Sequence, residues 1–232
     1  MLPDSKWRMV LEDLNYYPLE YGVEDADEAA EYDMMAMEAR ALLEASSHAE
    51  LLVVDGPLVD PPREPRGGVA RVRHKGYHKL RATMLSKAFR RTLVVGFVKK
   101  PRSERLLAPI LGWRGYDIDA ATTVLEEYRG FMLGPIRLRG GVYSEYESLG
   151  ICTSYIMAPW WPHAARVEAP CSKISEACSL LLALTPKGSL APIPVQAAHQ
   201  LASIGRSGVE GLRRALVEKI AVKAGWRLVA SS

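Results

Sequence analysis

The feature that most constrains the fold is a short apolar run, Leu51-Leu52-Val53-Val54, which ends on Asp55 and breaks at Gly56-Pro57. A continuous apolar run of this length is typical of a strand that is buried on both faces of a sheet. An aspartate at the carboxyl end of such a strand lies where open α/β sheets place their chemistry. The run therefore predicts a strand over 51–55 with a functional carboxylate at its tip. The competing interpretation is an aspartate that only starts the turn.

A predicted helix over residues 29–45 leads directly into this strand. Its apolar stripe has helical spacing and consists of Met34, Met37, Ala41 and Ala45. Glu38 falls inside the stripe, and a buried glutamate is rare unless it is paired or bound to a metal ion. We therefore expect Glu38 and Asp55 to face one cleft, where two carboxylates suit Mg²⁺ or Mn²⁺. Alternatively Glu38 reaches water from the edge of the stripe, as we expect for the weaker candidate Glu44.

A histidine lies on a second predicted helix, over residues 192–205, which has Pro194 in its first turn. Its apolar face consists of Val195, Ala198 and Ala202. His199 falls among these residues, so we expect it to point inward as a third polar group. The alternative is an ordinary core histidine with a hydrogen-bond partner.

Charge divides the first half of the chain into two blocks. Residues 1–62 carry 15 Asp or Glu and 3 Lys or Arg, whereas residues 63–105 carry 14 Lys or Arg and 2 acids. The basic block includes an expected amphipathic helix over 77–91, and its outward and following basic residues are Lys79, Arg81, Lys87, Arg91, Lys100 and Arg102. A basic surface beside an acidic cluster suits a polyanion that approaches a metal site. The alternative is a solvated basic surface, as in many thermostable proteins.

Length and composition exclude several classes of protein. A chain of 232 residues can bury a full core, and we expect one domain over 1–232. No apolar stretch approaches the roughly 20 residues that cross a membrane, and no apolar segment typical of a signal peptide follows the first residues. Cys152, Cys171 and Cys178 are an odd number without metal-type spacing, which favours a reducing, cytoplasmic compartment and argues against zinc.

Strands and helices alternate along much of the chain, which predicts an α/β class with some antiparallel pairing. The predicted strands are 7–14, 16–23, 51–55 and 92–98, followed by mainly strands over 131–170 with a turn at 160–162. The predicted helices are 29–45, 77–91, 117–128, 172–184, 192–205 and 209–222. The lysine that follows the strand 92–98, Lys99, is a basic group at a strand tip.

Four motifs occur in a fixed order: Leu51-Leu52-Val53-Val54-Asp55-Gly56-Pro57-Leu58, Val94-Val95-Gly96-Phe97-Val98-Lys99-Lys100-Pro101-Arg102-Ser103, Ala165-Arg166-Val167-Glu168-Ala169-Pro170 and Pro194-Val195-Gln196-Ala197-Ala198-His199. Their order resembles the NurA family of prokaryotic, mainly archaeal, DNA-repair nucleases. The resemblance implies a ribonuclease-H-like fold, a mixed sheet flanked by helices. It also implies Mn²⁺-dependent cleavage of single-stranded DNA, resection of DNA ends, a homodimer and docking on the hexameric HerA translocase.

The resemblance also implies roles for particular residues. Glu38 and Asp55 match the helix glutamate and strand-end aspartate that hold the metal ion. Lys99 matches the strand-end lysine, which would stabilise charge on the phosphate, and His199 matches the histidine that would orient water or donate a proton. A further family aspartate corresponds to Asp117 or Asp119. Unpaired bases are expected to stack on Trp160, Trp161 or Tyr77, and plain packing is the alternative for the two tryptophans.

One family feature is not evident. The family has an earlier metal-binding aspartate in an Asp-Gly-Ser, and this chain has only Asp4, followed by Ser5, in that region. We expect either a chain shortened at its start or a member with an altered site. Two functions therefore remain open, namely a metal-dependent nuclease and a catalytically weak or inactive subunit that binds DNA or the translocase. An unrelated α/β domain is the third interpretation.

Overall fold

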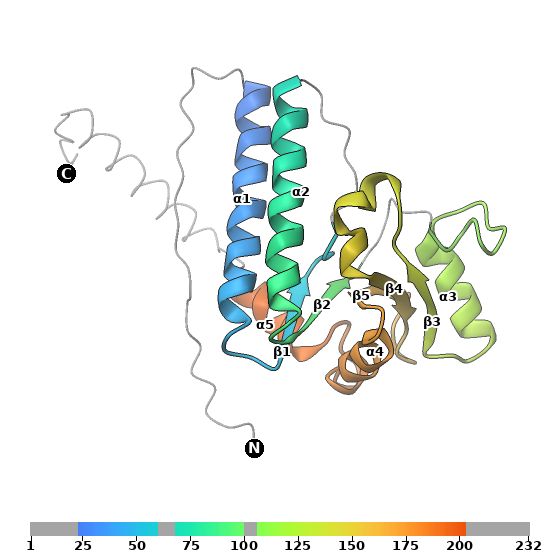
Figure 1. The fold of residues 1–232 in the computed structure, drawn as a ribbon. Coiled ribbons are helices and arrows are strands. Elements are labelled where there is room, and N and C mark those ends of the chain that lie inside the picture. Colours follow the sequence, from blue (N-terminus) through green and yellow to red (C-terminus); the bar gives the residue numbers. More distant parts are fainter. Residues whose placement is uncertain (1–22, 60–67, 100–105, 203–232) are drawn as a thin grey trace, which may run out of the picture. The chain divides into compact units, whose positions relative to one another are not determined.

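Residues 23–59, 68–99 and 106–202 are described by the computed structural model. The chain divides into two compact units, residues 1–195 and 196–232, and each is considered by itself. The first contains a five-stranded mixed sheet with helices on both faces (Figure 1). The described part of the second is the end of one helix. Within the described residues no helix is both long enough and apolar enough to span a membrane.

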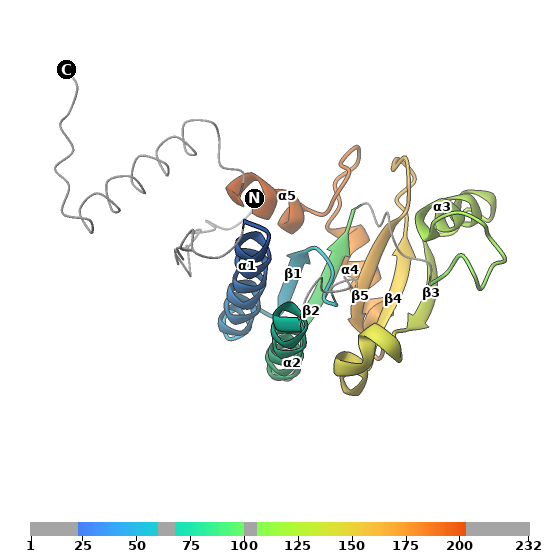
Figure 2. The same ribbon diagram turned by 90° about the horizontal axis from the view of Figure 1, so that it is seen from above.

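Two parallel strands begin the sheet. They are β1 (Leu51–Asp55) and β2 (Leu93–Val98), and α2 (Gly68–Ala88) connects them. The preceding helix, α1 (Val23–Ala45), lies beside α2 (Figures 1 and 2). Because β1 and β2 are parallel, their carboxyl ends meet at one edge of the sheet, and the residues that follow them become neighbours.

Three antiparallel strands complete the sheet in the order β1-β2-β5-β4-β3. They are β3 (Met132–Arg137), β4 (Ile151–Ile156) and β5 (Ala165–Pro170), and the 3-10 helix η1 (Gly141–Leu149) joins β3 to β4. The remaining helices are α3 (Asp117–Glu127), beside β3, α4 (Ile174–Ala183) and α5 (Ile193–Ala202) (Figure 2). The predicted α/β class with a mixed sheet flanked by helices is therefore confirmed.

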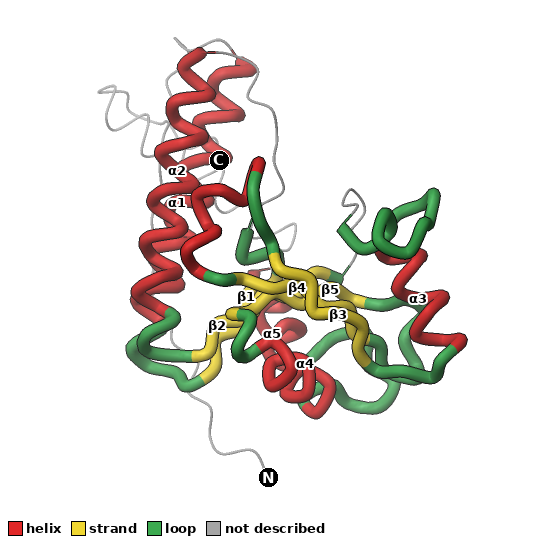
Figure 3. Tube along the Cα trace, turned by 45° about the vertical axis from the view of Figure 1, so that its right-hand side comes forward, coloured by secondary structure: helices red, strands yellow, loops and turns green. Residues whose placement is uncertain are grey.

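Alternate residues of β1 and β2 enter two separate cores, because successive side chains point to opposite faces of a sheet. Leu51 and Val53 of β1 pack into the cluster that contains α4. Leu52 and Val54 pack into the cluster that contains α2 and η1. Figure 3 shows α1, α2 and η1 on one face of the sheet and α4 on the other. This two-sided burial explains why β1 is a continuous apolar run.

The predicted strand over 51–55 is confirmed residue for residue, and the helices predicted over 117–128 and 172–184 agree with α3 and α4 within about two residues. α1 begins earlier than predicted, at Val23, and α2 begins at Gly68. η1 was not anticipated within 131–170, because short 3-10 helices carry little periodic signal. The predicted strands 7–14 and 16–23, apart from Val23, and the helix 209–222 lie outside the described residues.

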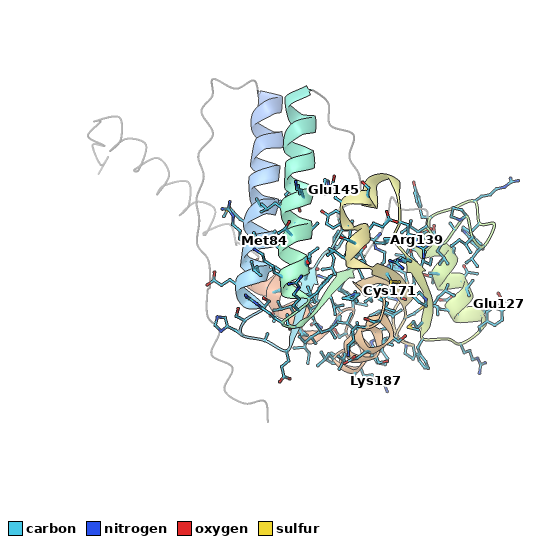
Figure 4. The ribbon with its side chains drawn as sticks, viewed as in Figure 1. Met84, Glu127, Arg139, Glu145, Cys171 and Lys187 are labelled. Carbon is cyan, nitrogen blue, oxygen red and sulfur yellow. A yellow bond between two sulfur atoms is a disulfide. The ribbon has the colours of Figure 1, made fainter. Side chains whose placement is uncertain are left out.

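The cysteines differ from the expectation of reduced thiols. Cys152 of β4 and Cys171, which follows β5 and is labelled in Figure 4, form a disulfide across 19 residues. The two strands are antiparallel neighbours, so their ends bring the sulfur atoms together, whereas the sequence spacing alone showed no reason to pair them. Cys178 is buried and has a free thiol.

Candidate active site at the carboxyl ends of the parallel strands

A carboxylate and an ammonium group form an ion pair where the parallel strands end. Lys99 Nζ lies 3.1 Å from Asp55 Oδ2, and the side chains are 35% and 29% exposed. Asp55 is opposite Phe97 in the register, and Lys99 lies two residues further along on the same face. The predicted positions of Asp55 and Lys99 at strand tips are confirmed, and their catalytic roles stay predictions.

The chain leaves β1 through residues 56–59, here named the exit turn, which folds back against β2. A Cβ added to Gly96 of β2 would lie 2.9 Å from both the Gly56 carbonyl oxygen and the Leu58 nitrogen. Only glycine leaves room for backbone at that distance. Gly96 therefore lets the exit turn pack closely on β2 directly beyond Asp55.

Arg81 holds the exit turn from the α2 side. Its Nε donates to the Leu58 carbonyl at 2.9 Å and its Nη2 donates to the Pro57 carbonyl at 2.7 Å. Its Nη1 donates to the hydroxyl of Tyr77 at 2.6 Å. The outward orientation that we predicted for Arg81 is wrong, because the residue is only 3% exposed. Carbonyls of the exit turn satisfy a guanidinium that the periodicity of α2 could not show to be buried.

Glu38 meets the same guanidinium from α1. Its Oε2 lies 3.3 Å from Arg81 Nη1, and its side chain is half-exposed. The prediction that Glu38 lies inside the apolar stripe is wrong, because α1 is rotated so that Ala39 is buried and Leu42 packs in the core while Met34 is exposed. Arg81 nevertheless connects Glu38 to the backbone that follows Asp55.

Glu168 of β5 holds the exit turn from the sheet side. Its Oε2 accepts hydrogen bonds from the backbone nitrogens of Leu58 at 2.7 Å and Val59 at 3.0 Å. Its Oε1 lies 3.0 Å from Nη2 of Arg166, and both side chains are buried. Burial lowers the pKa of Arg166, and the charge of Glu168 opposes this shift. The buried pair thus anchors the turn to the middle of the sheet.

His199 lies on α5, in the second unit, and is exposed. The prediction that His199 points inward is therefore wrong, and Ala198 is also exposed, whereas Val195 is buried. Of the described side chains on the expected apolar face of this helix, only Val195 is therefore buried. Its contribution to the site stays a prediction.

The other expected binding residues have mixed placements. Lys79, Lys87 and Arg91 are exposed, as predicted, and Lys100 and Arg102 lie outside the described residues. Of the expected stacking aromatics, Tyr77 and Trp161 are buried at 5% and 4% exposure. Trp160 is 37% exposed, and its indole nitrogen donates to the Ser189 carbonyl. The packing alternative therefore holds for Trp161, and Tyr77 is buried, against the expectation that it stacks on bases.

Asp117, one of two candidates for the further family aspartate, is a buried structural residue. Its carboxylate accepts hydrogen bonds from the backbone nitrogens of residues 106–108 at 2.6 to 3.0 Å. The hydroxyl of Tyr155 donates to it at 2.6 Å. Asp119 is exposed on the same helix. Asp117 therefore fixes the loop before α3 to the sheet.

The side chains predicted to bind metal carry oxygen ligands of the type that a hard divalent cation prefers. Asp55 and Glu38 supply carboxylate oxygens, which Mg²⁺ and Mn²⁺ prefer. Among the residues that the structure describes, no three His, Cys, Asp or Glu side chains gather as a metal-ion site. Protein sites for Mg²⁺ often use only one or two carboxylates, with waters and substrate phosphates as the other ligands. A cation held by such carboxylates would therefore need substrate oxygens and waters as further ligands.

Arg166 and Glu168 lie in the motif 165–170, but no role was predicted for them from the sequence. A usable signal existed, because opposite charges two residues apart in an apolar strand lie on one face and can pair. For Arg81 no such signal existed, since its acceptors are mainly backbone carbonyls of a distant turn.

Comparisons with known proteins agree with this architecture. Residues 8–204 match the family described as the NurA domain. A solved crystal structure, that of the NurA nuclease from Sulfolobus solfataricus, matches with a TM-score of 0.59 and 18% sequence identity. The match covers 88% of this chain and 70% of the Sulfolobus chain, and at this identity it shows a shared fold. The expected ribonuclease-H-like fold is confirmed by this match. No curated protein matches this chain.

Proposed function

This chain belongs to the NurA family, and we propose that it is a metal-dependent deoxyribonuclease. The observation that carries the proposal is the contact between Asp55 and Lys99 at the carboxyl ends of two parallel strands. That edge is where α/β sheets bind ligands and perform chemistry. A carboxylate beside an ammonium group suits a phosphodiester, since one group binds a cation and the other binds phosphate oxygens.

Asp55 and Glu38 would hold Mn²⁺ or Mg²⁺, and phosphate oxygens of the DNA would complete the coordination. When bound, such a cation supplies a water of lowered pKa and offsets phosphate charge. Lys99 would then bind the non-bridging oxygens and stabilise the charge that grows on them in the transition state. His199 would orient the water or give a proton to the leaving oxygen.

The exposed basic residues would bind the phosphate backbone of DNA. Lys79 and Lys87 are exposed on α2, and Arg91 is exposed just beyond it. We propose that these residues, with Lys100 and Arg102, contact the backbone without reading sequence. Binding should therefore weaken steeply with salt, and removal of one contacting charge should reduce the salt dependence by about one unit.

We further propose that the protein works as a homodimer in DNA double-strand break repair, where it resects ends beside a HerA-type hexameric ATPase. This proposal is supported by the family resemblance of the four motifs. Light scattering after size-exclusion chromatography would test the dimer, and co-elution with a HerA-type hexamer would test the partnership. A monomer that does not co-elute would exclude both.

A second function is favoured by a specific observation. Both proposed metal ligands are engaged by bases, Asp55 by Lys99 and Glu38 by Arg81, and no third ligand joins them in the described residues. The chain would then be a catalytically weak or inactive subunit that binds DNA or the translocase.

The deciding experiment is digestion of an end-labelled single-stranded DNA with Mn²⁺. It compares the full chain with Asp55→Ala and with Glu127→Ala, which removes an exposed acid at the end of α3. Cleavage by the full chain and by Glu127→Ala, but not by Asp55→Ala, supports the nuclease. If none of the three cuts while all bind DNA, the structural subunit is the better account.

A further inference from the structure

We propose that Arg81 is a positioning residue for the nuclease reaction: it sets the Glu38 carboxylate and the exit turn in one fixed arrangement. The inference rests on the proposed function. Arg81 belongs to neither carboxylate's element, since Glu38 lies on α1, Asp55 ends β1 and Arg81 lies on α2. It would act through the groups that it holds and would not touch the substrate.

The guanidinium of Arg81 imposes a fixed geometry on the groups that it contacts. This group is planar, and its donors point in fixed directions. In Arg81 those donors reach two consecutive carbonyls of the exit turn, the Tyr77 hydroxyl and the Glu38 carboxylate. A rigid group with these contacts determines where α1 lies relative to the end of β1. A lysine has one ammonium on a flexible stem and could not make the same set.

The exit turn is held from both sides. Arg81 binds the carbonyls of Pro57 and Leu58, while Glu168 binds the amides of Leu58 and Val59. Gly96 lets the turn rest on β2 without an intervening side chain. Because Asp55 immediately precedes this turn, its backbone has little freedom to move relative to Arg81.

The contact between Arg81 and Glu38 contributes little to the free energy of folding. A buried ion pair is often no more stabilising than hydrophobic side chains of the same volume. The partner carboxylate of Glu38 is also half-exposed, where an ion pair contributes little to stability. The ion pair with Glu38 therefore adds little to the stability that the hydrogen bonds of Arg81 to the exit turn and Tyr77 already supply. A requirement to hold the Glu38 carboxylate beside the exit turn accounts for the additional contact.

The test compares Arg81→Lys with Arg139→Lys, the same change at an exposed arginine labelled in Figure 4 that has no part in the proposed DNA contacts. Mn²⁺ affinity is measured from the electron paramagnetic resonance signal of the free ion, and kcat and KM from cleavage of single-stranded DNA. Residues that orient metal ligands typically change metal affinity about 10- to 100-fold, so Arg81→Lys should bind Mn²⁺ at least about tenfold more weakly. It should lower kcat by a similar factor and change KM less than about twofold, since uniform substrate binding is unaffected.

Arg139→Lys should match the wild type in Mn²⁺ affinity, kcat and KM. A folded Arg81→Lys protein with wild-type Mn²⁺ affinity and kcat would overturn the inference. If Arg81→Lys does not fold, Tyr77→Phe removes the hydroxyl contact and keeps the charge. That variant should bind Mn²⁺ measurably more weakly than the wild type, and equal affinity would overturn the inference.

The two proposals can fail separately. If the wild type binds Mn²⁺ but cuts no DNA, the nuclease is excluded, and Mn²⁺ affinities still decide the role of Arg81. If Glu38→Gln binds Mn²⁺ as tightly as the wild type, Glu38 is no ligand and the positioning role is overturned even in an active nuclease. If the wild type binds no Mn²⁺, both proposals are overturned.

Discussion

Lys99 Nζ lies 3.1 Å from Asp55 Oδ2, so the two residues that end the parallel strands neutralise each other at the exposed edge of the sheet. Neither side chain is deeply buried, since they are 35% and 29% exposed. Their ionic contact is therefore partly solvated and contributes little to fold stability.

Replacement of Lys99 separates phosphate stabilisation from metal binding. Lys99→Met should lower kcat about 10²- to 10³-fold, the usual effect of removing one donor to a developing anion. Its Mn²⁺ affinity should not fall, because the ligand Asp55 loses only a competing cation. Single-turnover cleavage and Mn²⁺ titration measure the two effects. Lys187→Met, at an exposed lysine labelled in Figure 4, is the control. A kcat for Lys99→Met within about twofold of the wild type would exclude the role.

Removal of Glu168 tests the anchor of the exit turn. Glu168→Ala leaves buried Arg166 without this carboxylate and the amides of residues 58 and 59 without their acceptor. Loss of one partner of a buried pair typically costs about 3–5 kcal/mol, so the free energy of unfolding in urea should fall by that amount. Glu176→Ala, which breaks the exposed pair with Lys173, should cost less than about 1 kcal/mol. Equal effects of the two variants would contradict the anchor.

The two aspartates of α3 should behave differently. Asp117→Asn replaces an acceptor oxygen with a donor in front of backbone amides, and each buried amide left unsatisfied costs about 1–3 kcal/mol. Asp119→Asn, on the exposed side, should change stability by less than about 0.5 kcal/mol. Thermal unfolding of both variants measures this. If instead Asp119→Asn abolished cleavage without loss of stability, Asp119 would be the further family aspartate.

Gly96, packed under the exit turn, and Gly76, inside α2, should respond in opposite ways to substitution by alanine. Gly96→Ala places a methyl group 2.9 Å from backbone atoms, and such overpacking costs about 1–3 kcal/mol. It should also lower cleavage, because the turn beyond Asp55 must shift. Gly76 lies inside α2, and a Cβ added there would have no atom within 4 Å apart from the backbone of its own helix. Gly76→Ala should therefore stabilise the protein by about 0.5–1 kcal/mol. Chemical denaturation and cleavage assays on the same samples distinguish these outcomes.

Cys178 provides a test by pH. Burial raises the pKa of its thiol to about 12 from an ordinary value of 9.0, although a hydrogen bond with Ser154 opposes the shift. The folded state therefore retains a proton that the unfolded state loses above pH 9.0. The contribution of this thiol to stability is complete below pH 9.0 and is lost as the pH rises toward about 12.

The same thiol should react slowly with iodoacetamide in the folded protein at pH 8 and rapidly after unfolding, since the thiolate is the reactive form. Mass spectrometry counts the modified cysteines. Cys152 and Cys171 should remain unmodified without reductant, because they form the disulfide. Rapid labelling of Cys178 in the folded protein would show that it is not buried in solution.

Secondary structure was largely predictable where local pattern and burial agree. β1 could be predicted because a strand buried on both faces must be apolar throughout, and α3 because its apolar residues recur at helical spacing. η1 and the disulfide were missed, since the first has no strong period and the second depends on strand pairing. Glu38 and His199 were assigned to buried faces, and the structure exposes both.

The sequence by itself determined that Asp55 and Lys99 stand at strand ends, because each follows directly on an apolar run. Only the tertiary structure decided that these ends are neighbours, since that depends on parallel pairing of β1 with β2. Only the tertiary structure decided, too, that Arg81 is buried. A helix can rotate about its axis to bury a charge when another segment offers enough acceptors, and here the exit turn and Glu38 offer them.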